Sequence, residues 1–258
     1  MNILDKIVAA RAKRLDEKKS RVKERSMHRS AGEPLPFFNT ATGVTLIAEC
    51  KKGSPSRGVF VEDYDPVVIA GQYERGGADA LSVLTEPDFF FGDDAHLAAV
   101  KRSVSLPVLR KDFIFDPYQV TESWALGADA ILLIASLLSK SQLKELTARA
   151  AGLGMEVLLE VHSGEELQKV SDIPVHAIGV NARNLKDFSV DFKAIKTLCA
   201  QIPQGRIAVA ESGIKGINVV KELYNAGYRG FLVGEYFITA ADREKKVAEV
   251  VKALQEKL

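Results

Sequence analysis

The sequence predicts an α/β fold, a (β/α)8 TIM barrel with an N-terminal helical extension. The first observation is length, since 258 residues is close to the roughly 250 residues at which an eightfold α/β barrel closes. The second is rhythm: from residue 45 onward, short runs rich in Val, Ile, Leu and Ala alternate with segments of helical periodicity. Strands that alternate with helices indicate parallel βαβ units, and eight near-equal units favour closure into a barrel.

The first part of the chain, residues 1–44, differs from the rest and is expected to be a helical extension that packs on the barrel. Ile3, Leu4 and Ile7 recur at helical spacing, with basic side chains between and after them. We interpret this pattern as a solvated amphipathic helix, and a basic helix that covers an anionic site is the alternative. Residues 45–258 are expected to form the barrel, and both parts together a single domain.

Eight apolar runs are the expected strands, and their starts are about 26 residues apart on average. They are Thr45–Glu49, Ala80–Leu84, Val108–Lys111, Ala130–Ile134, Glu156–Val161, Ala177–Asn181, Ile207–Glu211 and Gly230–Val233. The expected helices are 66–76, 94–103, 117–126, 139–153, 164–170, 192–201, 216–227 and 241–256. Glycines at 77, 127 and 227 end three of these helices just before a strand. A doubly wound open sheet is the alternative, but its G-x-G-x-x-G turn is missing.

Composition excludes several classes of protein. The chain is 47% hydrophobic and 27% charged, which excludes disorder, collagen and coiled coil. A net charge of +1 argues against a nucleic-acid partner. The longest apolar run, 130–135, is far below the ~18–20 residues of a membrane span. Cys50 and Cys199 form no disulfide or zinc motif, and Asp5 interrupts any signal core, so we expect a cytoplasmic protein without a membrane partner. A monomer is a separate expectation.

Polar side chains gather at the carboxyl ends of the expected strands, where barrels of this type carry their function. Glu49 and Lys51 share one face at the end of the first strand, because side chains alternate. Lys111 ends the third strand and Glu160 lies near the end of the fifth. A single polar strand end is often only the start of a loop, but several together indicate a site. A lysine and a glutamate across one opening form an acid/base pair.

A separate pattern indicates a phosphate. Gly213 and Gly234 follow the seventh and eighth strands, where barrels frequently bind phosphate through backbone N–H groups. Ser54 adds a hydroxyl after the first strand, and Arg183 joins the lysines in what we expect to be a cationic mouth. The pattern indicates a phosphorylated small molecule, although many barrels share it and it cannot name the molecule.

Several blocks of the sequence resemble indole-3-glycerol phosphate synthase, and the resemblance runs over nearly the whole chain. The most specific block is 47–58, which contains the signature E-x-K-x-x-S-P-S from Glu49 to Ser56. Further blocks follow in order and on the expected strands: 81–86, 109–113, 179–185 and 210–214. The resemblance implies a carboxy-lyase of tryptophan biosynthesis that converts 1-(2-carboxyphenylamino)-1-deoxyribulose 5-phosphate, a small anionic sugar phosphate, into indole-3-glycerol phosphate. It implies no metal and no organic cofactor.

The resemblance also implies roles for individual residues. Lys111 is the general acid of the condensation, and Glu160 is the general base of the dehydration. Lys51 binds the substrate carboxylate and is a candidate second acid, while Glu49 orients the lysines. The remaining candidates position the substrate, hold its phosphate or wall its aromatic ring: Asn181, Arg183, Ser212, then Ser54, Gly213, Gly234 and the backbone of Glu235, then Phe90 and Phe113.

Two points stay open in the sequence. Glu235 and Tyr236 follow Gly234 where the family more often carries a small residue such as serine, which puts a side-chain hydroxyl contact in doubt. His162 is interpreted as a loop residue and not as a base.

Two rival functions are open as well. One is another phosphate-binding barrel enzyme, such as the isomerase that catalyses the preceding step of tryptophan biosynthesis. The other is a non-enzymatic barrel that binds a metabolite. This rival predicts that at least one of Lys51, Lys111 and Glu160 is missing, whereas all three are present.

Overall fold

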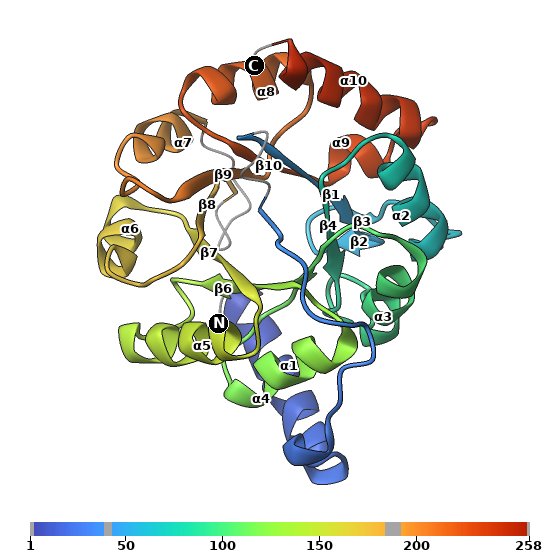
Figure 1. Cartoon of the computed structure of the whole chain (residues 1–258), viewed down its shortest axis with the longest axis vertical. Helices are drawn as coiled ribbons and strands as arrows, with labels where there is room; N and C mark the ends of the chain where they lie inside the picture. Colours follow the sequence, from blue (N-terminus) through green and yellow to red (C-terminus); the bar gives the residue numbers. More distant parts are fainter. Residues whose placement is uncertain (1–2, 39–42, 184–191, 257–258) are drawn as a thin grey trace.

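The computed structural model describes residues 3–38, 43–183 and 192–256. Within these residues, eight parallel strands close into a barrel with helices around it, so the predicted (β/α)8 fold is confirmed (Figure 1). The first barrel strand, β1 (Thr45–Cys50), pairs with β4 (Ala80–Leu84) on one side and β10 (Gly230–Val233) on the other. The end of one family-like block, residues 184–185, lies outside the described residues.

The observed elements follow the expected ones closely. The other barrel strands are β5 (Val108–Lys111), β6 (Ala130–Ile134), β7 (Glu156–Val161), β8 (Ala177–Asn181) and β9 (Ile207–Glu211). The surrounding helices are α2 (Pro66–Arg75), α3 (Asp94–Ser103), α4 (Pro117–Leu126), α5 (Lys140–Gly152), α6 (Gly164–Val170), α7 (Phe192–Cys199), α8 (Ile217–Asn225) and α10 (Arg243–Gln255). Four short elements were not expected: the 3-10 helix η1 (Glu24–Ser26), β2 (Gly53–Ser54), β3 (Gly58–Val59) and α9 (Glu235–Ile238).

Local signals explain where the helices begin and end. Asp65 and Asp116 precede α2 and α4, and their side chains accept hydrogen bonds from backbone N–H groups of the first turn. A proline follows each cap at the first helical position, where its missing N–H costs nothing. Gly127 ends α4 in the left-handed conformation, with φ of 101°. These caps fix the points at which the chain turns back into the next strand.

The core has two layers because side chains alternate along each strand. In β6, Ile131 and Leu133 face the helices and join the outer core. Leu132 and Ile134 of the same strand face the barrel interior and join the inner core. The barrel is therefore filled by side chains, and the space for a ligand lies at its ends.

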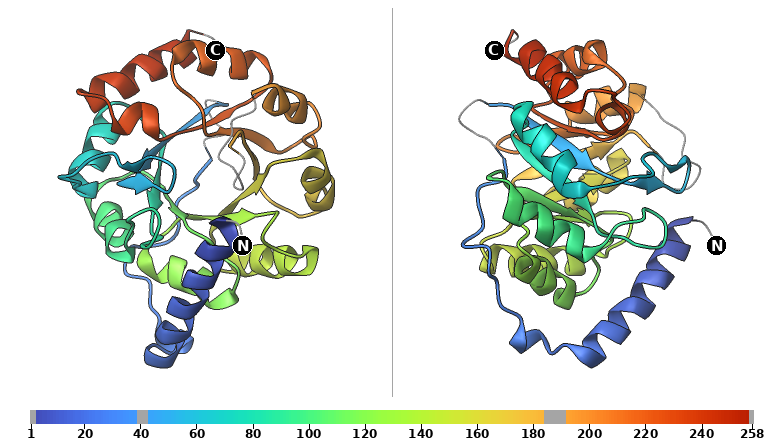
Figure 2. Two further views of the ribbon diagram at one scale, coloured as in Figure 1. Left: turned by 180° about the vertical axis from the view of Figure 1, so that it is seen from behind. Right: turned by 90° about the vertical axis from the view of Figure 1, so that its right-hand side faces the viewer.

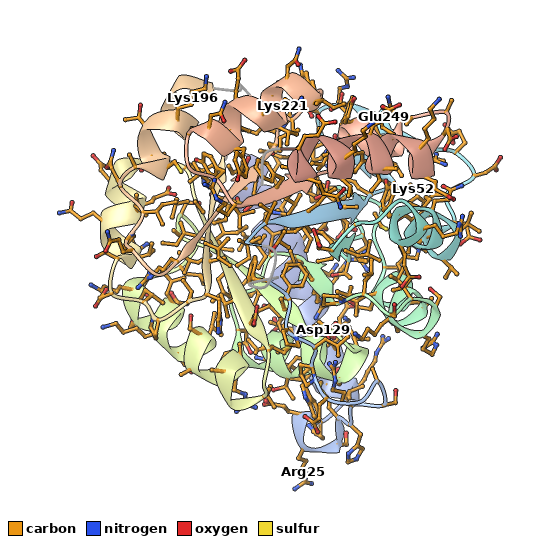
Figure 3. The ribbon with its side chains drawn as sticks, turned by 45° about the horizontal axis from the view of Figure 1, so that its top comes forward. Arg25, Lys52, Asp129, Lys196, Lys221 and Glu249 are labelled. Atoms are coloured by element: carbon orange, nitrogen blue, oxygen red, sulfur yellow. The ribbon has the colours of Figure 1, made fainter. Side chains whose placement is uncertain are left out.

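The N-terminal segment contacts both ends of the barrel. Helix α1 (Ile3–Arg21) lies on the same side as β2 and β3, and the chain then passes round to the opposite side (Figure 2). Arg11 Nη2 lies 2.6 Å from Asp112 Oδ2 at the end of β5. Arg29 Nη2 lies 3.0 Å from Asp129 Oδ1, which precedes β6 at the other end. Figure 3 shows Asp129 within the molecule, while Arg25 stands at the tip of this segment.

The outer helices carry charged side chains. Lys196, Lys221 and Glu249 lie on α7, α8 and α10 (Figure 3). Lys196 Nζ forms an ion pair with Glu222 at 2.8 Å, and exposed pairs of this kind contribute only about 0–1 kcal/mol. Over residues 3–38, 43–183 and 192–256, we find no helix with the length and apolarity that crossing a membrane requires.

Candidate active site

The carboxyl ends of the strands surround a cavity of about 350 Å³, a size suited to a small metabolite. All the candidate site residues of the sequence analysis line it: Glu49, Lys51, Ser54, Phe90, Lys111, Phe113, Glu160, Asn181, Arg183, Ser212, Gly213, Gly234 and Glu235. They come from distant parts of the chain because the closed sheet brings every strand end to one opening. Their roles stay predictions.

Lys111 lies at the centre of the cavity between two carboxylates. Its Nζ donates hydrogen bonds to Glu160 Oε2 and to Glu211 Oε2, both at 3.0 Å. The lysine side chain is 13% exposed and the two carboxylates are 2% and 1% exposed. Burial disfavours the ammonium, but Glu160 and Glu211 outweigh it and raise the pKa of Lys111 well above its usual value. Lys111 is therefore an ammonium at neutral pH.

The two carboxylates next to Lys111 have different proton affinities. Burial raises the pKa of Glu160, but Lys111 and His162 outweigh it and lower that pKa to about 2. Burial raises the pKa of Glu211 to about 8, and the negative charge of Glu160 adds to the effect. Near neutral pH, Glu160 is thus ionised while Glu211 holds a proton. Two carboxyl groups with separated pKa values are typical of acid/base sites.

Glu211 is a site residue that sequence reasoning missed. It is the last residue of β9, and lines the cavity beside Ser212 and Gly213, which were predicted. The sequence did contain a signal for it: Glu211 is a polar residue at the carboxyl end of an expected strand, which is the criterion that identified Lys111. Gly179 leaves room for this carboxylate: a Cβ at that position would overlap Glu211 Oε1.

The titration of Glu211 has a measurable effect on stability. Its pKa is raised from 4.5 to about 8, so the folded protein keeps a proton that the unfolded chain releases. The stabilisation is full below about pH 4.5 and is lost as the pH rises through 8. We expect the unfolding free energy of the wild type, measured in urea, to fall relative to that of Glu211→Gln over this window.

A matched control is Glu244→Gln, which removes an exposed carboxylate paired with Arg75 at 2.8 Å. Its stability difference from the wild type should stay constant over the same pH range. If the difference for Glu211→Gln is equally constant, Glu211 does not hold its proton in the folded protein and the assignment is wrong.

A second acid/base pair lies at the end of β1. Lys51 Nζ forms an ion pair with Glu49 Oε2, and both side chains are largely buried. Gly234 approaches this pair so closely that a Cβ at this position would overlap Glu49 Oε2. Gly234 therefore has a steric role in addition to its predicted phosphate contact: it leaves room for the carboxylate.

The loops after β9 and β10 form the glycine-rich end of the cavity. Ser212 and Gly213 both have left-handed backbone, with φ of 63° and 70°. A non-glycine residue in this region costs about 1–3 kcal/mol and is concentrated at functional sites. Gly234 is followed directly by the short helix α9, whose first N–H groups have no partner inside the helix. Backbone donors thus meet here from two loops.

The unusual Glu235 has a specific partner. Its Oε1 lies 2.7 Å from Arg57 Nη2, in the loop between β2 and β3. The carboxylate is thereby neutralised by a guanidinium, which reduces its repulsion of an anion bound at the backbone of the same residue. A glutamate at position 235, in place of the small residue that the family more often carries here, is therefore compatible with donation from its backbone N–H to a bound anion.

Two aromatic side chains, Phe90 and Phe113, form part of the cavity wall. The rings of Phe90 and Phe113 lie 6.0 Å apart, within the range of a favourable ring pair. Phe113 belongs to the inner core together with Ile7 of α1. The N-terminal helix thus packs on the core at the end of the barrel where the aromatic wall lies.

One expectation about this site needs correction. The lysines do line the opening, but Glu49 and Glu160 offset their charge, so the mouth is not simply cationic. His162 is a loop residue, as expected, because it follows the last residue of β7, and its Nε2 lies 3.3 Å from Glu160 Oε1. Among the described residues, no group of three or more His, Cys, Asp or Glu side chains is arranged to hold a metal ion.

The family model described as Indole-3-glycerol phosphate synthase matches residues 4–250. The chain belongs to the indole-3-glycerol phosphate synthase family. A relative named indole-3-glycerol phosphate synthase from Campylobacter jejuni is 43% identical, over 98% of this chain and 99% of its own. Another, from Acetivibrio thermocellus, is 41% identical over 96% of this chain and 98% of its own. The resemblance inferred from the sequence blocks is thus confirmed.

A solved structure extends the comparison of the fold alone. Thiamine phosphate pyrophosphorylase from Pyrococcus furiosus superposes with a TM-score of 0.64 at 16% identity, covering 85% of this chain and 100% of that chain. The family match begins at residue 4, so in this indole-3-glycerol phosphate synthase family member helix α1 is part of the matched region, together with the barrel.

Proposed function

We propose that this protein is an enzyme of tryptophan biosynthesis, a carboxy-lyase that converts 1-(2-carboxyphenylamino)-1-deoxyribulose 5-phosphate into indole-3-glycerol phosphate, carbon dioxide and water. One observation carries the proposal beyond family membership: Lys111 Nζ lies 3.0 Å from each of two buried carboxylates, Glu160 and Glu211, at the carboxyl ends of the strands. Ring closure followed by loss of water needs a proton donor and a proton acceptor in one place.

The first step is condensation. The ring carbon that bears the carboxylate attacks the ketone carbon, and a carbon–carbon bond forms. The Lys111 ammonium gives a proton to the ketone oxygen, which becomes a hydroxyl. The bond to the carboxylate then breaks and carbon dioxide leaves, which restores the aromatic ring. The raised pKa of Lys111 means that the group enters the step charged, but it also makes the ammonium a weaker acid, so its position beside the ketone oxygen is the main support for this role.

The second step is dehydration. The hydroxyl leaves as water after it takes a proton from a lysine ammonium, Lys111 or Lys51. Glu160 takes the proton from the carbon beside the nitrogen, and the double bond of the indole forms. Glu160 is ionised because Lys111 holds its pKa low, so it is ready to act as base.

The remaining candidate residues hold the substrate. Ser54, the backbone at Ser212 and Gly213, and Gly234 with α9 supply donors for the phosphate. Lys51 and Arg183 bind the carboxylate, and Phe90 and Phe113 cover the aromatic ring. Asn181 helps to lower the pKa of Glu160 and orients its carboxylate.

We also propose that residues 1–44 and 45–258 act as a single domain. Arg11 and Arg29 support this, because each forms a largely buried ion pair with the barrel.

The test of function offers the carboxyphenylamino sugar phosphate to the purified chain and follows indole fluorescence without added metal. We expect time-dependent product formation, proportional to the amount of protein. The control omits the chain and confirms by chromatography that the substrate stays intact. Absence of indole product from intact substrate would refute the proposed activity.

A further inference from the structure

A row of three side chains leads from the cavity towards solvent. Glu160 Oε1 lies 3.3 Å from His162 Nε2, and His162 Nδ1 lies 3.5 Å from Glu166 Oε2. The side-chain exposure rises along the row, from 2% at Glu160 to 15% at His162 and 22% at Glu166. The innermost member also contacts Lys111, so the row connects the central lysine with the outside.

Local structure fixes this row in place. Glu160 and His162 lie two residues apart at the end of β7, so their side chains share the face opposite to Val161. Ser163 then caps α6, and its side chain accepts a hydrogen bond from the backbone N–H of Glu166. The Glu166 carboxylate reaches back and accepts a hydrogen bond from the backbone N–H of His162 at 2.8 Å. The turn thus holds the imidazole between two carboxylates.

The surroundings of His162 favour its protonated form. Burial opposes the charge, but Glu166 and Glu160 outweigh it and raise the pKa of His162 above its usual value, with a smaller contribution from Glu211 on β9. Lys111 on β5 lies beyond Glu160. Among the residues that the structure describes, the buried Nε2 atom makes no hydrogen bond, so its 3.3 Å contact with Glu160 is an ion pair that has to become a hydrogen bond when the proton moves.

The proposed reaction takes up one proton in each turnover, because an anionic carboxylate leaves as neutral carbon dioxide. Condensation uses one lysine proton at the ketone oxygen, and departure of the hydroxyl as water uses a second. One proton returns inside the cavity, when Glu160 takes it from the carbon beside the nitrogen. The other has to enter from solvent before the lysines are fully charged again.

We propose that Glu166 and His162 form a proton relay that carries this proton from solvent to Glu160 and, through Glu160, to Lys111. The proposal rests on the proposed function. The imidazolium of His162 gives its Nε2 proton to Glu160 Oε1, which leaves a neutral ring with its proton on Nδ1. Rotation of the ring then turns the bare nitrogen towards Glu166, which passes on a proton taken from solvent and restores the imidazolium. Glu160 then gives a proton to Lys111 Nζ, 3.0 Å away. Every proton that leaves one group is gained by the next.

Glu160 can accept protons at the right moment in the cycle. After Lys111 has donated its proton, the positive charge that keeps the pKa of Glu160 low is gone. Protonation of Glu160 and transfer to the neutral Lys111 restore the starting state. His162 and Glu166 act through Glu160 and are relay and positioning residues, whereas Glu160 and Lys111 are the catalytic ones.

The first experiment uses His162→Ala, with kcat and KM measured with and without added imidazole. We expect kcat to fall about tenfold, less than the ~10²-fold of a lost general base, because water still enters the site slowly. KM should stay nearly unchanged, the solvent deuterium isotope effect on kcat should rise, and free imidazole should restore most of kcat. A merely structural role would not produce the last two results.

Matched controls separate the relay from other effects. His176→Ala removes an exposed histidine at the start of β8, at the opposite end of the barrel, and should keep wild-type kcat. Glu166→Gln should lower kcat in the same direction as His162→Ala, whereas Glu165→Gln, its exposed neighbour, should not. Thermal unfolding of each variant shows that it is folded.

The outcomes are distinguishable. An active wild type with unchanged kcat in His162→Ala or Glu166→Gln overturns the relay and leaves the proposed function standing. A fall in kcat that imidazole does not reverse, with an unchanged isotope effect, also overturns it. Absence of indole product from the wild type refutes the proposed function itself.

Discussion

Replacing Lys111 by methionine is expected to lower kcat by at least ~10²-fold, the lower end of the effect of losing a general acid. Methionine keeps an unbranched side chain of similar length, so it fills the space but supplies no proton. The change also removes the charge that lowers the pKa of Glu160, so the protonation state of the base changes together with the loss of the acid. The measurement is kcat by indole fluorescence at substrate saturation.

The control for this variant is Lys140→Met, which removes an exposed lysine paired with Asp172 at 2.8 Å. It should retain wild-type activity. Lys111→Met should still fold, because Glu160 and Glu211 can take up protons once the ammonium is gone. A folded Lys111→Met variant with near-normal kcat would exclude Lys111 as the general acid.

Replacing Arg110 by methionine is expected to destabilise the protein by about 3–5 kcal/mol, since it removes the buried cation that three carboxylates share. Asp112 keeps its pair with Arg11, and Asp94 and Glu122 keep theirs with Lys18. Arg110 is fully buried. Its Nη2 lies 2.6 Å from Asp94, 2.9 Å from Glu122 and 3.3 Å from Asp112. For a chain of this size, the loss corresponds to a decrease in Tm on the order of 10 °C, measured by calorimetry.

Arg75→Met is the matched control for this change. Arg75 Nε pairs with Glu244 at 2.8 Å, but the two side chains are 60% and 45% exposed. An exposed pair contributes about 0–1 kcal/mol, so Tm should change by only a few degrees. Equal Tm values for the two variants would show that the buried network around Arg110 adds no more than a surface pair.

The barrel could be predicted from the sequence because its signals are local. Runs such as Ala130–Ile134 are continuous and apolar, as expected of strands covered on both faces. The glycines that end helices, such as Gly127, are likewise visible within a few positions. The route of the N-terminal segment was not visible, because Arg11 meets Asp112 across 101 positions and no periodicity records such a contact.

The site was predictable only in part, for a related reason. Strand ends and family-like blocks identified Lys111 and Glu160. They do not show how one carboxylate changes the pKa of a neighbouring carboxyl group. Glu211 has a raised pKa because it is buried and because the charge of Glu160, on another strand, lies beside it. The sequence does not distinguish His162 from other loop residues, because its proposed role depends on its distances to Glu160 and Glu166. These properties come from tertiary contacts, which sequence spacing does not contain.

Closure of the barrel has a consequence for synthesis of the chain. Strand β1 pairs with β10, with Thr45 opposite Gly230. One edge of β1 therefore has no partner until the last strand has been synthesised. Until Val233 has left the ribosome, β1 and β9 each expose a row of unpaired backbone groups, which other chains can join. A ribosome that stalls shortly before this point leaves a nascent chain with two open edges, the form most in need of a chaperone.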